Sequence, residues 1–392
     1  MIIHTKKIIK NIGIKFLEEG KEIINVVKGE EKIKFILFKG KMTTNKIYKK
    51  TNLKPRTVRQ CLLKLEKKGK VKRIKGKEIN KKVRYCDSWI LKKEESMVKK
   101  VPENKVFAYY KTEHQNKGYR QHYMFFPKKI ILNEDFISAI GFFEAEGSKT
   151  KHKSIEAVNS EPKLIKSFLK LLEIFGIAKE NLTYRITFNK KIPRLIKKSK
   201  IIIEKEAEKV WRKEVQIPKN KKIKFSHLGK AEGKPKGEII KYGSLTLNYN
   251  SVLFRSFLFE LIKECKKNIQ TQKEAIAYLR GYLAGEAYVG KKDYQIQIAS
   301  NDENELDFLK KLLEKIEVKN SFSKKTSTCP KRLLISHLKS HIILEKKDIF
   351  LFHSSKEKAL IIKILNYKNV KEEKRKELEK KLKQINQKPV FY

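Results

Sequence analysis

Cysteine is scarce in this sequence, and long hydrophobic runs are absent. The 392 residues include four cysteines, which are scattered along the chain and form no Cys-x-x-Cys pair. This distribution disfavours a zinc site and predicts reduced thiols that mostly serve packing, as in a cytoplasmic protein. No run of about 18 apolar residues and no N-terminal signal-like segment occurs, so we expect neither a membrane protein nor a secreted one.

Acidic residues are also under-represented. Lysine and arginine together number 94 against 44 aspartates and glutamates, which gives a formal charge of +50. An imbalance that extends along the whole chain predicts a polyanionic partner, and the lack of membrane signals favours nucleic acid. The length is sufficient for two or three domains with a core each.

Against this background, two apolar stretches share one unusual pattern. Phe136–Ser148 and Tyr278–Tyr288 both read as helices with small residues four positions apart. Because residues at i and i+4 lie on the same helix face, two such helices can pack unusually closely. The expected interface residues are Gly141, Ala145, Gly281 and Gly285.

An acid follows the second small residue of each stretch. These acids are Glu146 and Glu286, and both lie at the expected end of their helix. Two carboxylates brought together beside negative helix C-termini favour the binding of divalent cations. The pair is therefore the candidate catalytic and metal-binding site.

A similar pattern also follows each motif. The segments Asn159–Leu164 and Asn301–Leu306 both precede an amphipathic helical run, with Ser160 and Asp302 as expected N-caps. The economical interpretation is an internal duplication with the length of a domain.

The paired stretches resemble the motifs of the LAGLIDADG homing endonucleases. Ala139–Gly147 and Leu279–Ala287 align without a gap, with Glu146 opposite Glu286. The resemblance implies an α+β fold, a pseudo-two-fold duplicated αββαββα saddle with the motif helices at its centre. It also implies Mg²⁺ (or Mn²⁺) held by the two acids, each serving one strand of a long double-stranded DNA site.

In such a saddle the sheets would face the DNA grooves and read base edges. Alternation along the expected strands places polar side chains on one face in each repeat. They are Arg185, Thr187 and Asn189 in the first repeat and Gln295 and Gln297 in the second, with Thr246, Asn248 and Asn250 as a further polar face.

The second motif departs from the usual pattern. Ala287 and Tyr288 stand where the family has Gly-Ser, and we expect both to resist the positive φ that glycine permits at a helix end. A displaced Glu286 would then give a nickase or an inactive binder. Glu144, whose counterpart is Ala284, is expected to be solvated at the helix edge.

Residues 30–92 predict a winged helix-turn-helix domain. Helices are expected over 31–38, from Thr43 or Thr44 to Lys49, and over 54–69, followed by strands at 71–74 and 83–85. The third helix would enter a DNA major groove, although winged helices also serve protein contacts. Its exposed candidates are Arg56, Thr57, Arg59, Gln60 and Lys64.

The remaining segments complete the predicted organisation. We expect a basic segment at 1–29, a linker or hairpin at 93–130, repeats at 131–268 and 269–369, and a basic helix at 370–392, either packed or free. The run after Arg212 predicts a loop that either follows DNA phosphates or is merely solvated. Its lysines are Lys219, Lys221, Lys222, Lys224, Lys230, Lys234 and Lys236.

Three functions are compatible with these patterns. The leading hypothesis is a free-standing, monomeric endonuclease that cuts both strands of a long duplex site. The alternatives are a catalytically degenerate DNA-binding regulator and an RNA maturase that binds structured RNA.

Overall fold

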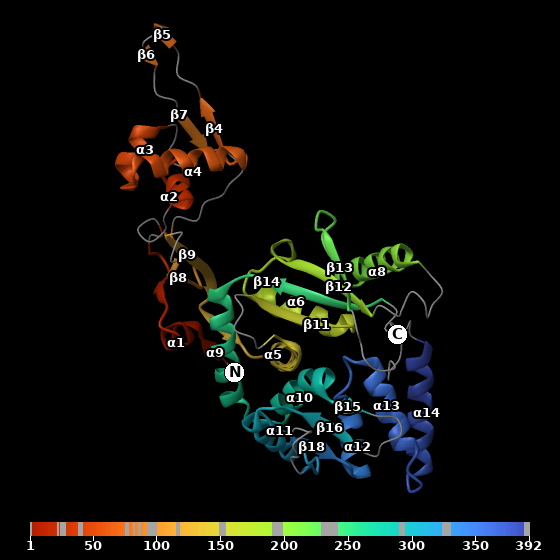
Figure 1. The fold of residues 1–392 in the computed structure, drawn as a ribbon. Coiled ribbons are helices and arrows are strands. Elements are labelled where there is room, and N and C mark those ends of the chain that lie inside the picture. The colour runs from red at the N-terminus through yellow and green to blue at the C-terminus, as the bar shows by residue number, and fades with distance from the viewer. Residues whose placement is uncertain are drawn as a thin grey trace. The chain divides into compact units, whose positions relative to one another are not determined.

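The computed structural model describes most of the chain, in two compact units, His4–Lys129 and Met1–Ile3 with Ile130–Tyr392 (Figure 1). The described residues are 2–21, 23, 29–37, 42–74, 78–80, 83–84, 88–91, 100–114, 118–148, 154–189, 199–228, 242–289, 295–323 and 331–387.

Among its described residues, the smaller unit contains three sheets, the smallest of which is the pair β5-β6, and a group of helices. Its elements and the strands at its boundary are β1 (Ile2–His4), α1 (Thr5–Asn11), β2 (Lys15–Leu17), α2 (Glu30–Leu37), β3 (Met42–Thr43), α3 (Thr44–Thr51), α4 (Pro55–Lys67), β4 (Val71–Ile74), β5 (Glu78–Asn80), β6 (Val83–Arg84), β7 (Ser88–Leu91), β8 (Lys105–His114), β9 (Gly118–Pro127) and β10 (Lys129–Ile131).

Helices α2, α3 and α4 enclose one hydrophobic core with the sheet β3-β7-β4. Thr43 caps α3 through its side chain, Pro55 occupies the first turn of α4, and Leu62 lies fully buried on the inner face of α4. The three predicted helices are thus present within a residue or two of their expected bounds. A second sheet, β2-β8-β9, contains a long antiparallel hairpin at β8–β9.

The larger unit contains both motif helices. The elements of its first half are α5 (Glu134–Glu146), β11 (Ile155–Asn159), α6 (Pro162–Ile174), η1 (Lys179–Asn181), β12 (Thr183–Asn189), α8 (Lys200–Val215), β13 (Ile223–Leu228), β14 (Ser244–Tyr249) and α9 (Val252–Asn268). Those of its second half are α10 (Gln272–Glu286), β15 (Tyr288–Val289), β16 (Ile296–Ala299), α11 (Glu303–Lys315), β17 (Ser321–Phe322), β18 (Arg332–Ile335), α12 (Leu338–Lys346), α13 (Ser354–Leu365) and α14 (Glu372–Gln387).

The two halves have equivalent sheets. In the first half the strand order is β11-β14-β12-β13, and in the second it is β15-β16-β18-β17. Strands β11, β14 and β12 correspond in order and direction to β16, β18 and β17. In the first half, an antiparallel bridge from Gly147 to Ala157 lies where β15 pairs with β16. The fold is therefore α+β and duplicated, as predicted.

The helices after β11 and β16 show that the repeats are related by a slightly different offset from the one read in the sequence. Phe168 and Leu309 are buried equivalents, as are Phe175 and Ile316. In this alignment of the two repeats, Asn159 is equivalent to Ser300, which is one residue before the predicted equivalent Asn301. Asp302 caps α11 as expected, whereas the predicted cap at Ser160 is wrong. The N-cap position of α6 is Glu161, which makes no side-chain capping bond.

An insertion enlarges the first half. Helix α8 begins at the side-chain cap Ser199, and β13 then adds a parallel strand beside β12. The strand β13 contradicts the predicted loop over this part of the run, because Ile223 is buried and the strand pairs along its length with β12. Lys219, Lys222 and Lys224 are exposed, whereas Lys230, Lys234 and Lys236 lie outside the described residues.

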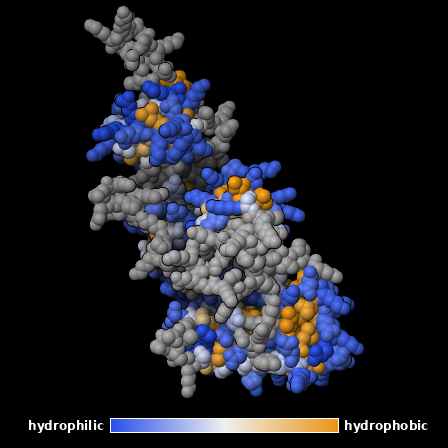
Figure 2. Space-filling view, turned by 45° about the vertical axis from the view of Figure 1, so that its right-hand side comes forward, coloured by the Kyte–Doolittle hydropathy of each residue, from blue (hydrophilic) through white to orange (hydrophobic). Residues whose placement is uncertain are grey.

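The C-terminal helix α14 packs against the second half instead of extending freely. Its Leu378 is fully buried, and its lysines pair with acids of α12 and α13. On the face shown in Figure 2, hydrophilic residues cover most of the described surface, as the lysine content predicts. Among the described residues, no helix has the length and apolarity needed to cross a membrane. Cys61 and Cys265 are free thiols, and Cys86 and Cys329 lie outside the described residues.

Candidate active site at the ends of the motif helices

Helices α5 and α10 lie side by side and cross at their glycines (Figure 1). A β-carbon at Gly281 would collide with the carbonyl oxygen of Ser138 and lie 2.7 Å from the amide nitrogen of Phe142. A β-carbon at Gly141 would likewise meet the backbone of Tyr278 and lie 3.1 Å from the nitrogen of Tyr282. Ser138 and Phe142, which face Gly281, occupy the same motif positions as Tyr278 and Tyr282, which face Gly141. The two helices are therefore related by a pseudo-two-fold axis.

The same approach continues to the helix ends. A β-carbon at Gly285 would lie 2.7 Å from the β-carbon of Ala145 and 2.9 Å from Cγ of Glu146. All four predicted interface residues therefore lie in the contact between the two helices. Since Glu286 directly follows Gly285, the close packing brings the two motif acids together.

Both helices leave their last turn in the same way. Gly147 has φ −75° and ψ 141°, and Ala287 has φ −68° and ψ 131°. The prediction that this position needs a positive φ is wrong, because extended backbone is open to alanine as well as glycine. Gly147 serves packing instead, since a β-carbon there would lie 2.7 Å from the ring of Phe143. The backbone at the end of α10 therefore gives no reason to expect that Glu286 is displaced.

The two acids have different surroundings. Glu146 is half-buried and accepts a hydrogen bond of 3.2 Å from Nδ2 of Asn159, while Glu286 is exposed. The pKa of Glu146 is raised to about 6, mainly by burial and also by the charge of Glu286, while the charge of Lys356 and the hydrogen bond from Asn159 oppose the rise. A carboxylate held in this way gains stability from a nearby cation.

Such a cation is present in the side chain of Lys356 on α13, which was missed in the sequence. Its Nζ donates to the carbonyl oxygens of Ala284 at 2.6 Å, Leu283 at 3.4 Å and Gly285, at the C-terminal end of α10. Burial lowers the pKa of Lys356 to about 8, and the charges of Glu146, Glu286 and Glu161 oppose this effect.

A buried acid–histidine pair, Glu161 and His353, is connected to the site through Asn159. Asn159 uses its Oδ1 to accept a 2.8 Å bond from the backbone of Glu161, so one side chain orients both Glu146 and the start of α6. The carboxylate of Glu161 lies 3.6 Å from Nδ1 of His353, whose pKa burial lowers to about 3. Asn159 and Glu161 belong to the first repeat and His353 to the second, so this group also links the two repeats.

Glu144 is not solvated, contrary to expectation. Its side chain is 13 % exposed, accepts a 2.7 Å ion-pair bond from Lys266 of α9 and accepts a hydrogen bond from the hydroxyl of Tyr278 on α10. The ammonium of Lys266 also lies 4.5 Å from the ring centroid of Phe308 on α11. Glu144 therefore joins the two repeats close to the site.

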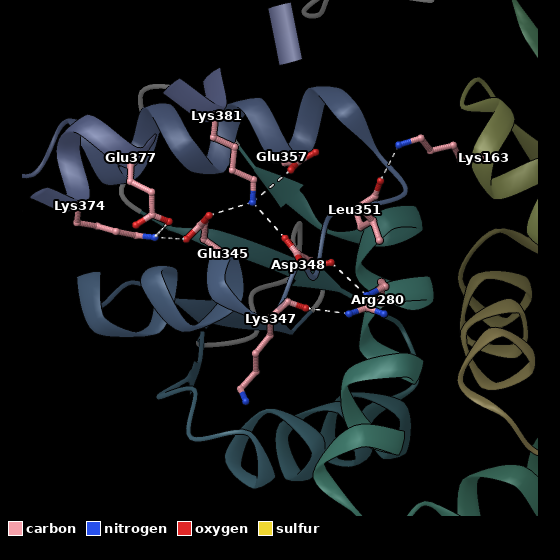
Figure 3. A network of polar contacts seen from close by, with 10 residues as sticks. All are labelled: Lys163, Arg280, Glu345, Lys347, Asp348, Leu351, Glu357, Lys374, Glu377 and Lys381. Carbon is pink, nitrogen blue, oxygen red and sulfur yellow. Dashed lines mark hydrogen bonds and ion pairs between the residues drawn. The ribbon is translucent and has the colours of Figure 1, made fainter. Parts of the chain in front are cut away.

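A polar network braces the turn between α12 and α13, as Figure 3 shows. Arg280 of the motif helix α10 donates to the carbonyl oxygens of Lys347 at 3.0 Å and Asp348 at 3.2 Å. Lys163 of α6 reaches the carbonyl oxygen of Leu351 at 3.2 Å from the first repeat. The turn that leads into the helix of Lys356 is thus tied to both repeats.

Helix α14 closes this network from the other side. Lys381 lies 3.0 Å from the buried Glu345, 3.1 Å from Asp348 and 3.5 Å from Glu357, the neighbour of Lys356. Lys374 adds a 2.8 Å ion pair to Glu345. The C-terminal helix therefore helps to fix α13 in place.

The donor set at the helix ends fits a divalent cation bound with water and phosphate oxygens. Mg²⁺ in nucleic-acid enzymes is commonly held by one or two carboxylates, with the remaining ligands supplied by water and substrate. Glu146 and Glu286 provide such a pair. No cluster of three or more metal-binding His, Cys, Asp or Glu side chains occurs in the described part of the chain.

The predicted base-reading residues lie mostly on the expected sheet faces. In β12, Arg185 is exposed and Thr187 half-buried, whereas their neighbours Tyr184 and Ile186 are buried. Arg185 also forms a 2.9 Å ion pair with Glu156 of β11. The side chain of Asn189 lies outside the described residues.

The second sheet repeats this arrangement. Gln295 and Gln297 are half-buried beside the buried Ile296, and Oε1 of Gln297 accepts a 2.8 Å hydrogen bond from Arg332.

The further polar face was predicted on β14 of the first sheet. Asn248 is half-buried there, and Asn250, just after the strand, is exposed. Thr246 lies on the same face, opposite Arg185 of β12, but it is buried between its cross-strand neighbours Val158 of β11 and Arg185.

Helix α4 of the smaller unit presents most of its predicted polar face. Arg56, Arg59 and Gln60 are exposed, and Thr57 is half-buried. Lys64 is exposed but forms a 2.8 Å ion pair with Glu30 of α2. Exposed pairs of this kind contribute little stability, so Lys64 can exchange its partner for a phosphate.

Comparison with known proteins identifies the motif region. A family model described as a LAGLIDADG-like domain matches the chain in two segments, residues 139–210 and 273–347. The first segment begins within α5 and the second within α10. No curated protein matches the chain.

Several solved structures share limited similarity with the chain. Mesophilic variants of the homing endonuclease I-DmoI give a TM-score of 0.33 at 13% identity, covering 55% of this chain and 90% of that one. The structure of I-DmoI in complex with DNA and Mn gives a TM-score of 0.33 at 14% sequence identity, and the match covers 56% of this chain and 98% of that one. The N-terminal LAGLIDADG domain of DUF199/WhiA gives a TM-score of 0.29 at 13% sequence identity, and the match covers 55% of this chain and 83% of that one.

Proposed function

The chain carries a LAGLIDADG-like domain in two matched segments, and from this premise we propose that it is a metal-dependent DNA endonuclease. The observation that carries the proposal is the meeting of Glu146 and Glu286 at the ends of two interlocked helices. Hydrolysis of a phosphodiester requires an activated water and neutralised charge on the phosphate, which carboxylate-held Mg²⁺ or Mn²⁺ supplies when bound.

Each residue of the site has a role in this proposal. Glu146 and Glu286 hold the cation and each serves one strand of the duplex. Asn159 orients Glu146 through its 3.2 Å hydrogen bond, and Glu144 keeps the two motif helices in register through Tyr278. The close contact at Gly141 and Gly281 sets the separation of the two acids.

DNA recognition would use two surfaces. The charge of +50 supplies attraction to phosphates along the whole chain. Exposed or half-buried polar residues of the two sheets, Arg185, Thr187, Gln295 and Gln297, would read base edges in the grooves. We further propose that residues 30–92 form a winged helix whose α4 presents Arg56, Arg59 and Gln60 to a second stretch of duplex.

A DNA-binding regulator without cleavage is the second candidate, and one observation favours it. Lys356 already brings a positive charge to the two acids, as a metal ion would. A lysine in this position can stabilise the carboxylates without supplying an activated water.

Cleavage of a randomised duplex library tests the proposal. The protein incubated with Mg²⁺ or Mn²⁺ should yield discrete double-strand ends that share one long sequence, and EDTA should abolish them. Tight duplex binding without any ends would instead support the regulator, and a preference for structured RNA would contradict both.

A further inference from the structure

The helix that carries Lys356 lies beyond the matched family segments. The second matched segment ends at residue 347, whereas α13 spans Ser354–Leu365. The Lys356 side chain nevertheless returns to the end of α10, directly beside Glu286. This chain therefore brings to the motif acids a group from outside the matched domain.

The contacts of Lys356 combine two kinds of interaction. Its ammonium caps carbonyl oxygens at the C-terminal end of α10, where the helix dipole is negative. It also interacts with the charges of Glu146, Glu286 and Glu161, which belong to α5, α10 and the start of α6. Any hydrogen-bond donor could cap the carbonyl oxygens at the end of α10. Only a positively charged group can also offset the negative charges of the carboxylates.

We propose that Lys356 is a resident cation of the Glu146–Glu286 pair, which holds the two acids together without metal and competes with a divalent ion for them. The inference rests on the proposed function only in taking this pair as the metal site. Its electrostatic part can be measured without DNA or cleavage.

The physical reason is the crowding of negative charge. Two carboxylates and a helix C-terminus meet at this point, and like charges in a partly buried site destabilise the fold unless a cation offsets them. Without the lysine charge the two acids repel each other. A divalent ion then binds them more tightly, because it no longer competes with Lys356 for their negative charge. The bracing of α13 by Lys381, through Glu357, keeps the lysine in reach of the acids.

Two substitutions separate charge from capping. Lys356→Gln removes the charge but keeps an amide donor for the carbonyl oxygens, and Lys356→Met removes both. Lys358→Met on the same helix is the matched control, because Lys358 is half-buried as well. Each is made in the full chain, alone and together with Glu146→Gln.

Thermal unfolding in EDTA gives the first readout. We expect Lys356→Gln to unfold several degrees below the wild type at about pH 7, where both Glu146 and Lys356 are mostly charged, and Glu146→Gln to restore most of this loss. An equal loss with and without Glu146→Gln would overturn the proposal, because Lys356 would then be a helix cap only.

Binding of Mn²⁺ without DNA gives the second readout. We expect the affinity for Mn²⁺ to rise at least tenfold in Lys356→Gln and to stay unchanged in Lys358→Met. Unchanged or absent Mn²⁺ binding in Lys356→Gln would overturn the competition. A wild type that cuts no DNA while both expected shifts appear would reject the endonuclease and leave the resident cation standing.

Discussion

Glu146 lies against Gly285 of the opposite motif helix, so close that a β-carbon on the glycine would be 2.9 Å from Cγ of the glutamate. This contact couples the packing of the two repeats to the position of a motif acid. Any side chain added at Gly285 must displace Glu146 or Ala145, and the site is therefore as sensitive to helix packing as to its own charges.

Alanine substitutions of the motif glycines should show a graded effect. Gly281→Ala places its β-carbon against the backbone of Ser138 and Phe142, which cannot move separately from the helix. Gly285→Ala meets side chains that can shift. We expect Gly281→Ala to cost about 3 kcal/mol or more of unfolding free energy and Gly285→Ala about 1 to 2 kcal/mol.

Urea unfolding of the larger unit measures this difference. Trp211 is fully buried in that unit, and a Trp89→Phe background leaves it as the reporter. Equal and small losses for both glycine variants would mean that the helices do not approach as closely as the structure shows.

The raised pKa of Glu146 predicts a pH-dependent stability. Because its folded pKa, about 6, lies above the usual 4.5, the stability linked to its protonation is present below about pH 4.5 and is lost as the pH rises through 6. Glu146→Gln should therefore gain up to about 2 kcal/mol over the wild type at about pH 8, and less at about pH 4.5. Urea titrations at the two pH values, without metal, measure the difference; a gain that is independent of pH would contradict the assignment.

The polar link between the repeats should resist disruption. Tyr278→Phe removes the hydroxyl that donates to Glu144, and this leaves a largely buried carboxylate with Lys266 as its ion-pair partner. A loss of about 1 to 3 kcal/mol is expected in chemical denaturation, since a charged group loses a hydrogen bond. Glu173→Gln, at an exposed position of α6, is the control and should be neutral.

The C-terminal helix should stabilise the turn before α13. Lys381→Met removes a cation shared by Glu345, Asp348 and Glu357 and should lower the unfolding free energy by about 1 to 3 kcal/mol, because Glu345 is buried. Lys380→Met alters an exposed neighbour and should be silent. Hydrogen exchange of the turn amides should quicken only in Lys381→Met; protection that is equal in both variants would disconnect α14 from the turn.

The close helix pair could be predicted because its signal is local. Small residues four apart and an acid after them specify a face and an end of one helix, and Gly141, Ala145, Gly281 and Gly285 all lie in the contact. The duplicated sheets followed from period-two alternation, which also placed Arg185 on the face opposite Tyr184.

Residues whose role depends on distant contacts could not be predicted. Lys356 is one of 94 basic residues, and only the packing of α13 against α10 distinguishes it. Thr246 lies on the predicted polar face, but its burial depends on the strands β11 and β12 beside it, and the sequence does not specify this strand order. Glu144 appeared solvated because its partners, Lys266 and Tyr278, come from two other helices.

The most direct test of the account compares the two acids in one cleavage experiment. A randomised duplex library is treated with Mg²⁺ and wild type, Glu146→Gln, Glu286→Gln or the exposed control Glu173→Gln, and single-strand nicks are scored separately from double-strand ends. We predict discrete double-strand ends for the wild type and the control, and loss of these ends in both motif variants. Cleavage that survives in both motif variants would contradict the assignment of the helix ends as the active site.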